Sequence, residues 1–296
     1  MATVKTTNIT IPDQLLDPFL KKIQHGSAIA QLSTPEPMKF GKGVWSKFDI
    51  GEAEFVGESA NKSGSTVTKT SGAIMPYKFQ KTLRFSNEVE WANEEHRLMV
   101  IETLLAQMPR PLSRALDFGV VHAMNPATLT TVPAMVTAGY LANASSQNEA
   151  TGDIIADLDA AYAAVLGNGY VPNGVALAPA YAVDAVLARN TATNGDRSKL
   201  FPEFRPTTEV SSLDAFRAST SDTIGQGDVL AIAGDFDAVR WGVQKEIGIH
   251  KIEYGDPDGG GDLQRTNEVA FRAEIVYGWG IADEAAFSVI TAEEEE

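Results

Sequence analysis

The sequence predicts an α+β protein that contains unusually long elements. From Val269 to Ile281 every odd position is apolar, while the even positions include Arg272 and Glu274. Alternation with a period of two indicates a β-strand with one buried face. At roughly 3.3 Å per residue this strand is about 40 Å long, whereas a usual strand has about five or six residues. A strand of this length favours an elongated subunit over a compact enzyme.

A second long element is predicted to begin at Asn87. Asn87 and Glu90 have the spacing of a capping box, and apolar residues follow at intervals of three, four or seven. The expected helix, residues 87–108, is about 33 Å long. Prolines at positions 109 and 111 end or kink it, and we expect helix to resume over residues 112–122.

Two further regions are predicted, one before the long helix and one between the helix and the long strand. Residues 49–85 contain two β-rich runs around a Gly/Ser-rich tip, which is the signature of a long hairpin. Residues 125–234 read as a compact α+β unit with helices at 153–166 and 180–187 and buried strands at 175–178 and 229–233. The compact unit is thus inserted between the long helix and the long strand.

Composition narrows the function classes. The chain has 296 residues, of which 44% are hydrophobic and 21% charged, and it has no cysteine, which excludes disulfides and thiolate metal sites. A net charge of -15 argues against a nucleic-acid reader, and no apolar run approaches the length of a membrane span. We therefore expect a protein made in the cytoplasm, with no membrane partner.

The charge is distributed unevenly along the chain. Residues 1–48 carry six lysines against three acidic residues and are punctuated by prolines, whereas the chain ends in an acidic run over residues 293–296. A basic arm on an acidic body suggests docking onto a neighbouring copy. The alternative is a solvated terminus.

Motifs for catalysis, cofactors and metals are missing. The four histidines lie at scattered positions without paired-ligand spacing, and no phosphate-binding glycine loop follows a strand. The loop from Asp256 to Asp262 brings three carboxylates close together as calcium loops do, but it lacks the bidentate glutamate of an EF-hand. The residues favour a turn there over an ion site. We expect no catalytic residue, no cofactor and no metal.

Five short stretches occur in a particular order. They are Glu58-x-Ala60-x-Lys62-x-x-Ser65 in the hairpin, Ser86-Asn87-Glu88 at the start of the long helix, Ala233-Gly234-Asp235-Phe236, Asn267 to Glu274 in the long strand, and Ala286-Phe287. Together they resemble the major capsid protein family of tailed bacteriophages, which has the Hong Kong 97-type capsid fold. The resemblance covers nearly the whole chain.

The resemblance implies a division of the chain into parts. Residues 1–48 correspond to an N-terminal arm and residues 49–85 to an extended loop. Residues 86–124 and 235–292 correspond to a peripheral domain with the spine helix and long strands. Residues 125–234 correspond to an axial domain, followed by the acidic tail 293–296.

In some members of this family a lysine of the extended loop forms an isopeptide bond with an asparagine of a neighbouring subunit, helped by a glutamate. The matching positions here are Lys62, Asn267 and Glu274. In the alternative interpretation, which the residues favour, Lys62 is a solvated loop residue and Asn267 a turn residue. Glu274 then lies on the polar even face of the long strand, with Arg272, where we expect contacts between copies.

The implied function is structural: a shell of hexamers and pentamers that encloses double-stranded DNA without binding its sequence. The implied partners are further copies, a portal and decoration proteins. A separate scaffolding protein, or none, is expected, since no long helical scaffold segment precedes the arm. The implied localisation of the protein is the virion capsid, which is assembled in the host bacterial cytoplasm. An encapsulin-like nanocompartment is the alternative within the same fold. A hydrolase or a calcium-binding module is the remote one, supported only by the loop after Asp256.

Overall fold

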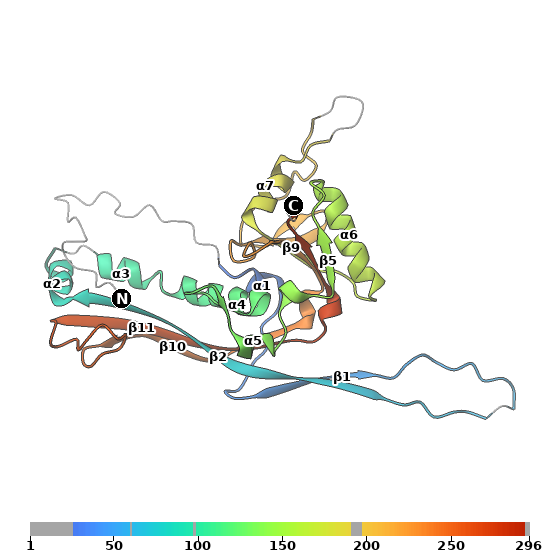
Figure 1. Cartoon of the computed structure of the whole chain (residues 1–296), viewed down its shortest axis with the longest axis horizontal. Helices are drawn as coiled ribbons and strands as arrows, with labels where there is room; N and C mark the ends of the chain where they lie inside the picture. Colours follow the sequence, from blue (N-terminus) through green and yellow to red (C-terminus); the bar gives the residue numbers. More distant parts are fainter. Residues whose placement is uncertain (1–25, 60, 97–98, 191–196, 294–296) are drawn as a thin grey trace.

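The computed structural model describes residues 26–59, 61–96, 99–190 and 197–293 (Figure 1). The first 25 residues of the expected arm and nearly all of the expected acidic tail lie outside these ranges. Within them, no helix is long and apolar enough to cross a membrane, and no three His, Asp or Glu side chains are grouped as a metal site. The described residues form one sheet of four strands, one of six and a small one of two, with helices packed on the two larger sheets.

The four-stranded sheet joins the predicted hairpin to the long strand. It consists of β1 (Gly43–Asp49), β2 (Thr68–Ser86), β11 (Glu268–Ile281) and β10 (Val239–Ile252), in that order and all antiparallel. The first part of β2 pairs with β1 and the rest, from Met75 on, pairs with β11. The hairpin is therefore a continuation of the sheet, and it projects from the body (Figure 1). The predicted boundary between arm and loop, at residues 48 and 49, lies inside β1.

The predicted long strand is confirmed as β11, but the prediction of a single buried face is wrong. Its odd face packs on the helices as expected: Val269 contacts Phe85 and Ile101, and the Trp279 ring lies against Gly119, where a Cβ would be only 2.5 Å from it. Its even face is also covered: the segment before β1 crosses it with Met38 against Gly278, and the loop before β11 lies over its first half, where Arg272 donates to the carbonyl of Pro257. Glycines in the strand leave the room that this crossing segment needs.

The expected single helix over residues 87–108 is wrong, because two helices replace it, α2 (Asn87–His96) and α3 (Val100–Leu105). The helix expected over residues 112–122 is confirmed as α4 (Pro109–His122), which begins three residues earlier. Met99 has a left-handed backbone with φ of 52°, and the Asn93 side-chain oxygen accepts a hydrogen bond from the Val100 N–H at 2.8 Å, so α3 has a start of its own. The prolines stand in the first turn of α4, where a missing N–H costs nothing. Glu90 makes an ion pair with Lys251 at 2.7 Å.

The six-stranded sheet forms the compact unit. Its order is β5-β12-β9-β6-β8-β7. The predicted helix is confirmed as α6 (Ile154–Gly167), with Asp153 as its N-cap accepting from the Ile155 N–H at 3.1 Å. The strand β12 (Phe287–Thr291) belongs to this sheet and pairs with both β9 and β5, although it follows the long strands in sequence. The strand β12 is buried along most of its length, because it lies inside the sheet between β5 and β9.

The other predicted strands and the second helix of this unit are also confirmed, as β6 (Gly174–Leu177), β9 (Val229–Gly234) and α7 (Pro179–Leu187). The remaining elements are α1 (Ala28–Leu32), β3 (Met124–Asn125), β4 (Thr130–Thr131), α5 (Pro133–Val136), η2 (Leu141–Asn143), β5 (Ser146–Glu149), β7 (Ser211–Leu213), β8 (Phe216–Thr220), η3 (Phe236–Ala238) and η4 (Glu284–Ala286).

Asp117 on α4 ties three parts of the chain together. This fully buried carboxylate accepts hydrogen bonds from the Ser27 hydroxyl at 2.6 Å and from the backbone N–H groups of Ala28 at 2.8 Å and Ile29 at 3.1 Å. It also accepts one from the Thr223 hydroxyl at 2.6 Å. Burial raises the pKa of the Asp117 carboxyl above its ordinary value, although the four donors oppose this. The carboxylate thus fixes the start of α1 and the loop after β8 to α4.

Replacing Asp117 by alanine is expected to destabilise the subunit by about 3 kcal/mol, because four buried donors lose their acceptor. The measurement is urea unfolding of the unassembled chain followed by circular dichroism. Asp159→Ala is the control, since Asp159 is exposed on α6 and its replacement is expected to change stability by less than about 0.5 kcal/mol. Equal stability of the two variants would contradict this role of Asp117.

Candidate assembly site

The hairpin exposes four large apolar side chains, Val44 and Phe48 on β1 and Ile50 and Phe55 in the loop that follows it. Phe55 is 93% exposed, and each of the other three is more than 60% exposed. At the start of β1 exposed residues alternate with the half-buried Gly43 and Trp45, and from Ser46 on every residue of the strand is exposed. Exposed large apolar side chains in such number are typical of a surface that is covered in an assembly.

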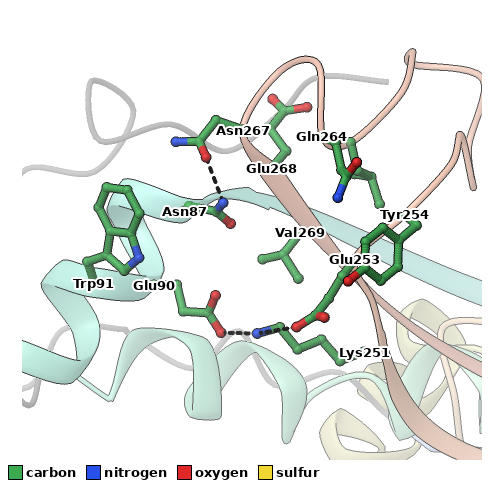
Figure 2. Close-up of a pocket in the computed structure, with 11 residues that line it drawn as sticks. Asn87, Glu90, Trp91, Lys251, Glu253, Tyr254, Gln264, Asn267, Glu268 and Val269 are labelled. Atoms are coloured by element: carbon green, nitrogen blue, oxygen red, sulfur yellow. Dashed lines mark hydrogen bonds and ion pairs between the residues drawn. The ribbon is translucent and has the colours of Figure 1, made fainter.

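A polar pocket of about 520 Å³ lies at the other end of the four-stranded sheet, between α2 and the loop that joins β10 to β11 (Figure 2). Its ion pairs join Lys251 to Glu90 at 2.7 Å and to Glu253 at 3.2 Å. The pKa of Lys251 is raised, mainly by the hydrogen bond to Glu90. Two exposed aromatic residues, Trp91 and Tyr254, also line the pocket. The pocket thus combines charged side chains with aromatic surface, and its ion pairs favour the charged form of Lys251.

Asn267 also lines this pocket and joins the loop to the start of α2. Its backbone is left-handed, with φ of 56°, which asparagine tolerates better than most residues. The Asn267 side-chain oxygen accepts from the Asn87 side-chain amide at 2.8 Å (Figure 2), and the Asn267 amide donates to Glu88 at 2.9 Å. The pKa of Glu88 is lowered, first by a hydrogen bond from its own backbone N–H and then by the one from Asn267. Within one subunit Asn267 therefore acts as a structural turn residue.

The three candidate cross-link residues are not close together within one subunit. Glu274 is seven positions further along the chain than Asn267, about 23 Å in a strand, and it is paired with Lys78 at 2.7 Å. Its side chain is 10% exposed, so the expected solvent-facing role of Glu274 between copies is not available to it in this conformation. Lys62 is exposed in the loop between β1 and β2, which lies at the opposite end of the molecule from α2 (Figure 1).

The aspartate loop before β11 is organised by an arginine that sequence reasoning missed. The side chain of Arg84 on β2 is 3% exposed and makes ion pairs with Asp258 at 2.8 Å, Glu268 at 3.0 Å and Asp256 at 3.5 Å. It also donates to the carbonyl of Gly261 at 2.7 Å. The guanidinium thus lies among the carboxylates that suggested a calcium loop. The signal in the sequence was the excess of negative charge in this loop, which requires a cation nearby. The residue that supplies the cation, Arg84, lies 172 residues before Asp256 in the chain.

Comparison with known proteins identifies the class of protein that has this fold. The model of the Phage capsid family matches residues 7–292, so the chain belongs to the phage capsid family. Among curated protein sequences no significant match was found.

Solved structures agree with this assignment over nearly the whole chain. A chain from Mycobacterium phage Ogopogo is 36% identical, with a TM-score of 0.85, and the match covers 99% of this chain and 100% of that one. A chain from Gordonia phage Cozz is 29% identical, with a TM-score of 0.80 and coverage of 98% and 94%. The capsid of a native GTA particle, computed with C5 symmetry, is 13% identical with a TM-score of 0.59 and coverage of 94% and 95%, which shows the same fold.

The expectation of a major capsid structural protein is therefore confirmed. The chain is a structural component of the virion capsid and not an enzyme, and it self-assembles into a shell that encloses phage DNA. Neither the encapsulin-like nor the hydrolase alternative is favoured by these matches.

Replacing Arg84 by methionine is expected to release the loop of residues 256–268 and to cost about 3 kcal/mol, because three carboxylates lose their buried counter-charge. Hydrogen exchange of the unassembled chain measures both the stability and the local opening. Arg265→Met is the matched control, since Arg265 is an exposed residue of the same loop. Unchanged exchange in that loop in the Arg84 variant would refute the role of the buried arginine.

Proposed function

We propose that copies of this chain form hexamers and pentamers that close into an icosahedral shell around the double-stranded DNA of a tailed phage. The observation that carries this proposal is the projecting hairpin with its exposed large apolar side chains. A hairpin with so little surface buried against its own body gains stability by packing on another copy. Such head-to-tail contacts are heterologous, and rings close when the rotation between copies allows it.

The parts of the subunit are proposed to divide this task. The arm and the extended loop, expected over residues 1–48 and 49–85, reach neighbouring copies, and the hairpin of β1 and the first part of β2 spans the boundary between them. Residues 86–124 and 235–286 form the wall, and residues 125–234, completed by β12, gather around the axes of the capsomers. A net charge of -15 suits a wall around DNA, because it prevents strong adsorption of the enclosed phosphates.

The proposed partners beyond the chain itself are a portal, decoration proteins and a separate scaffolding protein. The proposed place of assembly is the cytoplasm of the host bacterium. Production of the chain with and without the products of the neighbouring genes tests which of these partners it needs.

Negative-stain microscopy of the chain, produced alone and with its genomic neighbours, is expected to show closed shells or capsomers. Phe55→Ser is expected to reduce their yield at least about tenfold, because burying a phenylalanine at each of many contacts contributes about 2 kcal/mol per contact. Thr66→Ser, an exposed change in the same loop, is the control and should assemble normally.

The thermal unfolding of the unassembled chain is measured as well, to show that the variant is folded. Because Phe55 is 93% exposed in the subunit, its replacement should leave the thermal midpoint unchanged. A wild-type chain that remains a compact monomer under all of these conditions would refute the proposed shell.

We propose that the shell is held by noncovalent contacts, since the Asn267 amide is already bonded to Glu88 and Glu274 is paired with Lys78. Assembled particles boiled in denaturant are then expected to run as monomers on a gel. A ladder of covalent oligomers would contradict this. In that case Lys62→Arg and Asn267→Asp identify the two residues, because each removes one reacting group of the isopeptide bond.

A further inference from the structure

The hairpin touches the rest of the subunit through the inner face of β1. Gly43 and Trp45 are half-buried, whereas Val44 between them and all residues of β1 from Ser46 to Asp49 are exposed. The Trp45 ring occupies the space above Gly72, where a Cβ would be 2.5 Å from it, and it also lies near Gly280. Lys47 lies two residues further along β1 than Trp45, on the same face of the strand and closer to the tip of the hairpin.

Lys47 is bonded to two groups that do not belong to the hairpin. Its ammonium donates to the Tyr170 hydroxyl at 2.7 Å and to the Asp283 carboxylate at 3.1 Å, and it lies 5.3 Å from the centre of the Tyr170 ring. The Tyr170 hydroxyl donates to the same carboxylate oxygen of Asp283. The other oxygen of Asp283 accepts from the Ala285 N–H at 3.0 Å, so this carboxylate has a fixed position.

The three side chains come from three parts of the subunit. Lys47 belongs to the hairpin, Tyr170 follows α6 in the compact unit, and Asp283 lies in the connection from β11 to β12. These bonds therefore tie the hairpin directly to the six-stranded sheet. Such a tie restricts the angle at which the hairpin leaves the body.

The protonation states suit this arrangement near neutral pH. The pKa of Lys47 is raised, first by its hydrogen bond to Tyr170 and then by the one to Asp283. Burial raises the pKa of Tyr170, so its hydroxyl keeps the proton that it donates. Burial alone opposes a charged Asp283, but the hydrogen bonds from Tyr170, Ala285 and Lys47 outweigh it and lower the pKa of that carboxyl.

We propose that Lys47, Tyr170 and Asp283 form a latch that sets the direction of the hairpin, and that the hairpin pivots about Trp45 when the latch opens. The side chains of Lys47 and Asp283 are 51% and 33% exposed. An ion pair with this exposure changes an equilibrium by about fivefold at most, so the contacts of assembly are strong enough to open it. The consequence for shells rests on the proposed function, because the hairpin direction then sets the angle between neighbouring copies.

The test measures the hairpin direction in the unassembled chain, at concentrations below those at which shells form. The chain has no cysteine, so Thr68→Cys at the end of the hairpin and Ala163→Cys on α6 take two spin labels without background. Pulsed electron resonance gives the distribution of distances between them. Lys47→Met and Tyr170→Phe open the latch. Lys69→Met is the matched control, because Lys69 is an exposed lysine of the same hairpin whose ammonium lies over the Phe48 ring of β1.

The distance distribution is expected to broaden about twofold with Lys47→Met, less with Tyr170→Phe, and to stay unchanged with Lys69→Met. An unchanged distribution with Lys47→Met would overturn the latch, and so would equal broadening with Lys69→Met. The proposed function is tested separately by microscopy of the wild-type chain. Broadening in a chain that forms no shells would support the latch while refuting the shell.

Discussion

The architecture of this subunit depends on one buried carboxylate. Asp117 accepts four hydrogen bonds in the centre of the molecule, from the start of α1 and from the loop after β8. A buried charge with no cation beside it is tolerated only when its oxygens are fully bonded. The position of α1 is thereby fixed, and with it the path of the chain from α1 across the four-stranded sheet to the hairpin.

The long strand β11 shows how this path is accommodated. Its odd face is covered by the helices and its even face by the crossing segment and by the loop before β11, so that all but two of its fourteen residues are buried. Gly242 on β10 and Gly278 on β11 provide the space, since a Cβ at 242 would collide with the carbonyl of Glu36. A strand covered on both faces is a stiff element. This stiffness suits a wall that transmits force between its neighbours.

The two ends of the four-stranded sheet differ in how they are stabilised. At one end Arg84 holds the loop before β11 by ion pairs that lie inside the subunit. At the other end the hairpin exposes Phe48 and Phe55 and is held by the weak contacts of Lys47. A subunit that is rigid at one end and incompletely packed at the other gains most of its remaining stability from further copies.

The sequence by itself determined the class of the elements and their order. The alternation from Val269 to Ile281 defines a strand, and the apolar spacing after Asp153 defines a helix, because both patterns are local and repeat with the period of the backbone. The order of short motifs was enough to recognise the capsid family. Tertiary structure alone decided which faces are covered, that Asn93 divides the predicted helix, and that β12 leaves the long strands for the other sheet. It also decided that Arg84 is the cation of the aspartate loop and that Lys47 reaches Asp283, 236 residues away. These outcomes depend on contacts between distant residues, which no local period encodes.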